Sequence, residues 1–121
     1  MAHILIVDDT APVRFALSTV LQEHGHQTAE SADGQQALDS LASRAFDIVV
    51  TDIFMPEIDG IELITRLREE RPDMKIIAIS GGGARFVPSF AINLAHHMGA
   101  DIALQKPVNS EELLSAVQAL S

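Results

Sequence analysis

The sequence Ile4-Leu5-Ile6-Val7-Asp8-Asp9 is an unbroken apolar run that ends in two adjacent carboxylates. Continuous rather than alternating apolar residues are typical of a strand that is buried on both faces of a parallel sheet. Three further runs of this kind follow, at 48–50, 76–79 and 102–104. A weaker, more polar stretch at 26–29 indicates a fifth strand at an edge of the sheet.

Segments with helical spacing follow each of these strands. Their apolar residues recur every three or four positions, the pattern of a helix with one buried face. These residues are Val13, Leu17, Val20 and Leu21; Ala37, Leu38 and Leu41; Ile61, Ile64 and Leu67; Phe90, Leu94 and Met98; and Leu113, Leu114, Val117 and Leu120. Five strands that alternate with helices predict an α/β fold: a doubly wound, five-stranded parallel sheet with strand order 2-1-3-4-5.

Turn and cap residues agree with this division. Gly25 ends the first predicted helix, and Asp33-Gly34 and Asp59-Gly60 mark turns. Arg71-Pro72 ends the third helix. Either of the adjacent residues 109 and 110, an asparagine and a serine, can cap the last helix.

Size and charge narrow the possible functions. A chain of 121 residues fits one domain, which we expect to span 1–121. Its net charge of −9 repels nucleic acid and anionic lipid, so we expect neither as a direct partner. There is no cysteine, no apolar run near the ~20 residues needed to cross a bilayer, and no signal-peptide pattern at the N-terminus. These features predict a soluble, cytoplasmic protein.

Charged and hydroxyl side chains stand where the predicted strands end. Asp8 and Asp9 follow the first strand, Asp52 the third, Ser80 the fourth and Lys106 the fifth. Ligands of open parallel sheets bind at the carboxyl ends of the strands, and this strand order makes the first and third strands neighbours. Three carboxylates would then converge, and a bound cation would relieve their repulsion. Oxygen ligands favour Mg²⁺ or Mn²⁺ over zinc.

This set of residues suits phosphoryl transfer. A carboxylate such as Asp52 can act as the nucleophile and form an aspartyl phosphate. The transition state is loose, so catalysis depends on positioning and on neutralising charge at the equatorial oxygens. The metal and Lys106 would supply positive charge, and the Ser80 hydroxyl would supply a hydrogen-bond donor.

The same residues resemble a known family in order and spacing along essentially the whole chain. They are the pair Asp8-Asp9, the stretch Val-Thr-Asp-Ile-Phe-Met-Pro-Glu-Ile-Asp-Gly at 50–60, Ser80, Gly-Ala-Asp at 99–101, and Lys106-Pro107. In this arrangement the chain is similar to the receiver domain of bacterial two-component response regulators. The resemblance implies the CheY-like form of the flavodoxin-like (βα)5 fold.

The resemblance also implies a role for each matching residue. Asp52 would be the phosphoacceptor, Asp9 a direct metal ligand, and Asp8 a ligand acting through water. The backbone carbonyl of Phe54 would complete the protein's contacts with Mg²⁺ or Mn²⁺.

Three further residues would contact the phosphoryl group. Lys106 would bind the phosphoryl group, and the Gly81 N–H would donate a hydrogen bond to it. On activation the Ser80 side chain would move toward the phosphoryl group. The family implies a cis Lys106-Pro107 peptide bond as well.

The implied partners are a histidine kinase or a histidine phosphotransfer protein as donor, and a downstream protein as target. Such a chain is a self-modifying switch, not an enzyme with turnover on other substrates.

Two departures from the family pattern concern how the signal leaves the domain. Ala103 stands where the family usually has Tyr or Phe, three residues before the lysine. The stretch from Ser80 to Lys106 is also longer than is common, and three glycines occupy 81–83. We therefore expect this loop and the following helix, over 81–98, to carry the output.

The same residues bear on several alternative functions. A pseudo-receiver, which keeps the fold as a constitutive protein-binding module, is favoured by Ala103 but disfavoured by the intact acidic set. A flavin-binding domain is excluded because Asp8-Asp9 stand where such a domain binds the flavin phosphate, and like charges repel. A phosphatase is disfavoured because nothing in the sequence resembles a separate substrate pocket. The histidines, including the adjacent pair His96-His97, do not have the spacing of a metal site. Either a stand-alone receiver or a piece of a longer regulator fits the sequence.

Overall fold

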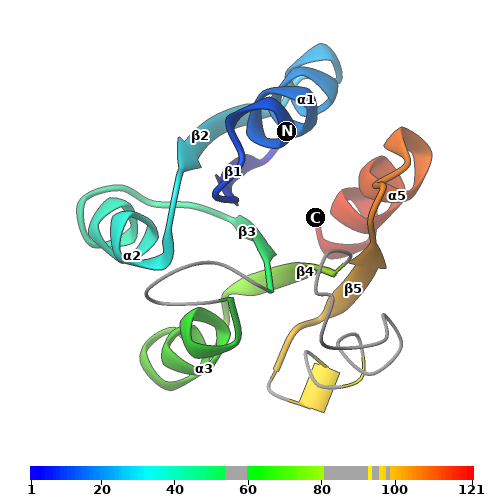
Figure 1. The fold of residues 1–121 in the computed structure, drawn as a ribbon. Coiled ribbons are helices and arrows are strands. Elements are labelled where there is room, and N and C mark those ends of the chain that lie inside the picture. Colours follow the sequence, from blue (N-terminus) through cyan, green and yellow to red (C-terminus); the bar gives the residue numbers. More distant parts are fainter. Residues whose placement is uncertain (54–59, 81–92, 94–95, 98) are drawn as a thin grey trace.

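The computed structural model describes residues 1–53, 60–80, 93, 96–97 and 99–121. Its five strands form one parallel sheet with the order β2-β1-β3-β4-β5 (Figure 1). The strands are β1 (His3–Val7), β2 (Gln27–Ser31), β3 (Ile48–Asp52), β4 (Lys75–Ser80) and β5 (Ile102–Gln105). The predicted fold class and strand order are therefore confirmed.

Four helices are seen in the described part of the chain. They are α1 (Ala11–Glu23), α2 (Gly34–Ser43), α3 (Gly60–Glu70) and α5 (Ser110–Leu120). Each matches a predicted helix. The sequence predicts a fifth helix through Phe90, Leu94 and Met98, and these three residues lie outside the described part of the chain. None of the described helices has the length and apolar character needed to span a bilayer.

The sheet has one core on each face, because successive strand residues point to opposite sides. Helices α2 and α3 cover one face, and α1 and α5 cover the other (Figure 1). The first core includes Leu5, Val49 and Ile76 from the strands with Leu41, Leu63 and Leu67 from the helices. The second includes Ile4, Ile6, Val50 and Ile77 with Leu17, Leu21, Leu113 and Val117. This double burial explains the continuous apolar runs of the central strands.

Strand β2 is the polar edge strand that the sequence indicates. Among the strands of the described part it pairs only with β1, in the register His3–Gln27 to Val7–Ser31. Polar contacts join it to α1: the Ser18 and Thr28 hydroxyl oxygens lie 2.6 Å apart, and the Gln22 amide donates to Thr28 at 2.8 Å. Hydrogen bonds therefore replace part of the apolar packing at this edge.

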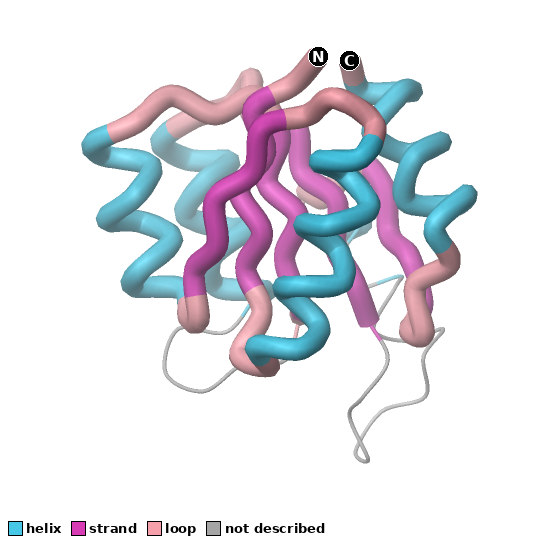
Figure 2. The backbone as a smooth tube through the Cα atoms, turned by 90° about the horizontal axis from the view of Figure 1, so that it is seen from above, coloured by secondary structure: helices cyan, strands magenta, loops and turns pink. Residues whose placement is uncertain are grey.

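The two chain termini lie side by side at the amino ends of the strands (Figure 2). Met1 and the last two residues, Leu120 and Ser121, line one cavity there. The carboxyl ends of the strands form the opposite edge of the sheet, so neither terminus lies near that edge.

Arg68 on α3 connects the helix to the segment before β5. Its guanidinium binds Asp101 Oδ2 at 2.7 Å and also donates to the backbone carbonyls of Gly99 and Met74, at 2.8 and 2.7 Å. Asp101 Oδ2 accepts the N–H of Ile76 at 2.8 Å as well. These contacts fix the chain as it enters β5, four residues before Lys106.

Gly60, the first residue of α3, packs directly on the backbone of Asp52 and Ile53. Its N–H donates to the Ile53 carbonyl at 2.9 Å. A Cβ at this position would collide with the backbone carbonyl of Asp52 and lie only 2.6 Å from Ile53 Cα. Only glycine allows the helix to start this close to the end of β3.

We therefore expect Gly60→Ala to lower the free energy of unfolding by about 1–3 kcal/mol, the usual cost of overpacking. Chemical denaturation followed by circular dichroism measures this change. Glu69→Ala, at an exposed position of the same helix, serves as the control and should change stability little. Wild-type stability of Gly60→Ala would contradict the close approach.

Candidate functional site

The predicted site residues meet at the carboxyl edge of the sheet. Asp52 is the last residue of β3, and Asp8 and Asp9 directly follow its neighbour β1. Ser80 is the last residue of β4, and Lys106 follows β5. All five residues lie at this edge as predicted, and the predicted convergence of the three carboxylates is confirmed.

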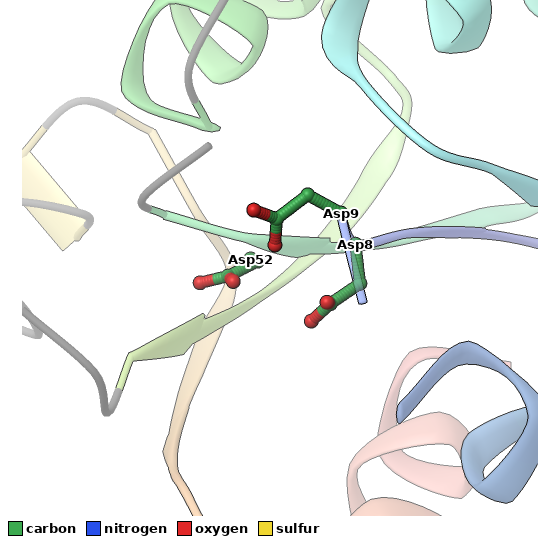
Figure 3. Close-up of side chains that lie close together, drawn as sticks. All are labelled: Asp8, Asp9 and Asp52. Carbon is green, nitrogen blue, oxygen red and sulfur yellow. The ribbon is translucent and has the colours of Figure 1, made fainter. Parts of the chain in front are cut away.

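The three carboxylates form one cluster (Figure 3). Asp8, Asp9 and Asp52 each have a carboxylate oxygen within 4.8 Å of the others'. Asp8 and Asp52 are only 1% and 6% exposed, whereas Asp9 is open to solvent. Three carboxylates this close repel one another, and an all-oxygen donor set fits a hard divalent cation. The residues present therefore fit Mg²⁺ or Mn²⁺.

Lys106 bridges the two buried carboxylates. Its Nζ lies 2.9 Å from Asp8 Oδ2 and 3.1 Å from Asp52 Oδ2. Burial lowers the pKa of the Lys106 ammonium group, but the hydrogen bond to Asp8 and the charge of Asp52 outweigh burial, so the pKa lies above its ordinary value. The group is therefore charged at neutral pH. The charged Lys106 ammonium group contributes fully to the free energy of unfolding at any pH below the ordinary lysine pKa. This contribution is lost only as the pH rises through the raised pKa.

Asp8 has a partner for each of its backbone groups and for each carboxylate oxygen. Its N–H donates to the Ser31 carbonyl at 3.1 Å, and Oδ1 accepts the Thr10 N–H at 2.8 Å. Its backbone carbonyl accepts from Arg14 Nη1 at 2.7 Å, and Oδ2 binds Lys106. The turn after β1 is thus held from the sheet, from α1 and from the loop after β5.

Ser80 lies one strand away from Asp52 and is 1% exposed. Its backbone carbonyl accepts the N–H of Lys106 at 2.7 Å, which joins the ends of β4 and β5. The Lys106–Pro107 peptide bond is cis, as the family resemblance implies.

Two predicted site residues, Phe54 and Gly81, lie outside the described residues, as does most of the 81–98 segment. Ala103 pairs with Ala78 on β4 and packs, partly buried, against the core under α2 and α3. A methyl group therefore stands where the family usually has a ring. Of the two histidines beside Gly25, His24 is exposed, and His26 Nδ1 accepts the Ala2 N–H at 3.0 Å.

The fold and the acidic edge define a receiver domain, and the chain belongs to that family. Residues 4–118 match the response regulator receiver domain family. Among curated proteins, the chain is 38% identical over 118 residues to the response regulator MprA of Mycolicibacterium vanbaalenii. It is 36% identical over 119 residues to the transcriptional regulatory protein TcrA of Mycobacterium tuberculosis. Each match covers 98% of this chain but 49% and 46% of the relative, so the chain spans about half the length of these proteins.

Solved structures agree in fold. The receiver domain of the Francisella response regulator 1452 aligns with a TM-score of 0.88 at 28% identity, over 99% of this chain and 96% of that one. Vibrio cholerae chemotaxis protein CheY4 aligns with a TM-score of 0.86 at 29% identity, over 100% and 99%. NtrX of Brucella abortus, in a crystal structure with ADP, gives 0.90 at 27% identity over 98% of this chain and 26% of that chain. The described part of the chain therefore has a CheY-like fold.

Proposed function

We propose that this chain accepts a phosphoryl group on Asp52 from a histidine kinase or a histidine phosphotransfer protein, and then changes conformation to signal to a protein partner. The observation that carries the proposal is the bridging Lys106, whose ammonium group contacts both Asp52 and Asp8 inside an acidic cluster. The chain acts as a self-modifying switch in the cytoplasm. It does not turn over other substrates.

In the proposed reaction, a carboxylate oxygen of Asp52 attacks the phosphorus of the donor. The new O–P bond forms as the N–P bond of a phosphohistidine breaks, and the electron pair of that bond stays on the imidazole nitrogen. Asp8, Asp9, Asp52 and the Phe54 carbonyl would bind Mg²⁺ or Mn²⁺, with Asp8 acting through water. The bound cation would neutralise charge on the transferring group.

The other residues have roles that follow from charge and hydrogen bonding. Lys106 lies 3.1 Å from Asp52 and is charged, so it can move from the carboxylate to a phosphoryl oxygen over a short distance. The Ser80 hydroxyl and the Gly81 N–H would donate to the same group. Together they would replace the water that otherwise stabilises the phosphoryl charge.

The test is to incubate the protein with acetyl phosphate and Mg²⁺ and to record the intact mass. We expect the gain of one phosphoryl group, and we expect no gain when EDTA removes the metal. Absence of an adduct, in a folded protein that also fails to bind beryllofluoride, would favour the pseudo-receiver, which acts as a constitutive binding module. Ala103 is the feature that makes this second function worth testing.

The proposed partners are proteins. With a net charge of −9, this chain has no electrostatic attraction for nucleic acid or anionic membranes. If it is part of a longer regulator, any contact with DNA would belong to other residues of that regulator.

A further inference from the structure

Arg14 on α1 lies beneath the acidic turn without belonging to the cluster. Its side chain is only 17% exposed. Nη1 donates to the backbone carbonyl of Asp8 at 2.7 Å, and Nε lies 3.3 Å from Glu30 Oε1 on β2. A guanidinium group holds its N–H donors on separate nitrogens in one rigid plane, whereas a lysine has all its donors on a single nitrogen. Arg14 therefore connects the acidic turn to the end of the edge strand.

The turn is held by an internal hydrogen bond, from the Thr10 N–H to Asp8 Oδ1 at 2.8 Å, and by contacts from outside, and α1 begins without the usual cap. Thr10 is the N-cap residue, but its side chain makes no capping hydrogen bond. Its hydroxyl instead points to Asp9 Oδ1 at 3.4 Å, a long contact. Asp9 is exposed, so its position follows mainly from the backbone of the turn. That backbone is fixed at Asp8 by Ser31 on one side and by Arg14 on the other.

We propose that Arg14, oriented by Glu30, is a positioning residue that sets the Asp8–Asp9 turn so that the Asp9 carboxylate lies beside Asp52 and the cluster can bind a divalent cation. The inference rests on the proposed function, since it concerns the same metal site. Arg14 contacts neither the cation nor the phosphoryl group in this arrangement. It acts through the backbone carbonyl of Asp8.

The charge of Arg14 and its proposed positioning role predict opposite changes in Mg²⁺ affinity when Arg14 is replaced. Arg14 carries a positive charge close to the acidic cluster, so by electrostatics alone its removal would strengthen cation binding. Loss of a group that orients metal ligands typically weakens metal affinity by 10–100-fold. The sign of the change in affinity therefore distinguishes the two roles.

The experiment measures Mg²⁺ binding to wild type, Arg14→Met and Arg14→Lys by isothermal titration calorimetry. Calorimetry suits this chain because it has no Trp and no Tyr to report binding by fluorescence. We expect about tenfold weaker binding for Arg14→Met. We expect a smaller loss for Arg14→Lys, because one ammonium group cannot bind the Asp8 carbonyl and Glu30 in the same geometry. Arg66→Met, which removes an exposed arginine of α3, is the control and should bind as wild type does.

Phosphorylation by acetyl phosphate gives a second readout. We expect Arg14→Met to need about tenfold more Mg²⁺ for half-maximal rate, while the rate at saturating Mg²⁺ stays near that of wild type. Equal or tighter Mg²⁺ binding by Arg14→Met would overturn the inference. If Arg14→Met does not fold, the Mg²⁺ affinity of Arg14→Lys is the test. Wild-type affinity of Arg14→Lys would overturn the inference. Failure of wild type itself to bind Mg²⁺ would instead refute the proposed function.

Discussion

Asp52→Asn is expected to abolish the gain of a phosphoryl group from acetyl phosphate, at any Mg²⁺ concentration. The amide of asparagine is not a nucleophile toward phosphorus. In the proposed site the other two carboxylates of the cluster bind the metal. The fold should survive, because asparagine keeps the size of the side chain and Lys106 retains Asp8 as its partner at 2.9 Å. Intact mass and circular dichroism, measured on the same sample, separate loss of chemistry from loss of structure.

Asp39→Asn is the matched control for this change. Asp39 is an exposed acid of α2, and its carboxylate accepts a surface hydrogen bond from the Gln35 amide at 3.1 Å. This variant should be phosphorylated as wild type is. An adduct of equal yield on Asp52→Asn would place the phosphoacceptor elsewhere and would contradict the role assigned to Asp52.

Lys106→Met should destabilise the protein most when no divalent cation is present. The change leaves Asp8 and Asp52, with side chains 1% and 8% exposed, without their shared cation. Removing one partner of a buried ion pair costs about 3–5 kcal/mol, and we expect about 3 kcal/mol because the lysine itself is 23% exposed. Mg²⁺ should restore much of this loss, because it would supply positive charge to the same carboxylates.

Chemical denaturation in EDTA and in Mg²⁺ measures both parts of this prediction. Lys75→Met, at the exposed start of β4, removes the same charge away from the cluster and should cost little in either buffer. We also expect Lys106→Met to accept phosphate far more slowly than wild type, even where Mg²⁺ has restored its stability. If Lys106→Met were as stable as wild type in EDTA, the lysine would not be compensating the buried carboxylates.

The strand order and the acidic edge could be predicted because they depend on short, local patterns. Runs such as Ile4–Val7 show burial on both faces, and a polar residue that directly follows a buried strand must lie at the edge of the sheet. Once the order 2-1-3-4-5 was assumed, Asp8 and Asp52 had to be neighbours. The choice of cap for α5 needed coordinates: Asn109, not Ser110, accepts the N–H groups of Glu111 and Glu112, at 2.7 and 3.3 Å.

The contacts of the partly buried arginines Arg14 and Arg68 could not be predicted in this way. Arg14 and Arg68 lie in helical segments where a charged residue usually faces solvent, and nothing in the local pattern singles them out. Their partners come from other parts of the chain: Arg68 contacts Asp101, 33 residues away, and Arg14 contacts Glu30 on the neighbouring strand. A long side chain that reaches several backbone carbonyls depends on the packed structure, not on its neighbours in sequence.

The adjacent termini have a consequence for how the chain could be rearranged. Met1 and Ser121 line the same cavity at the amino ends of the strands, while the acidic cluster lies at the carboxyl ends. A short linker could therefore join them, and the chain could be opened at Gly25, around which there is free space. In that circular permutant Asp8 and Asp9 would follow Lys106 in sequence, yet every strand would keep its neighbours. The acidic cluster depends on which strands are neighbours in the sheet, and not on the order of those strands in the sequence.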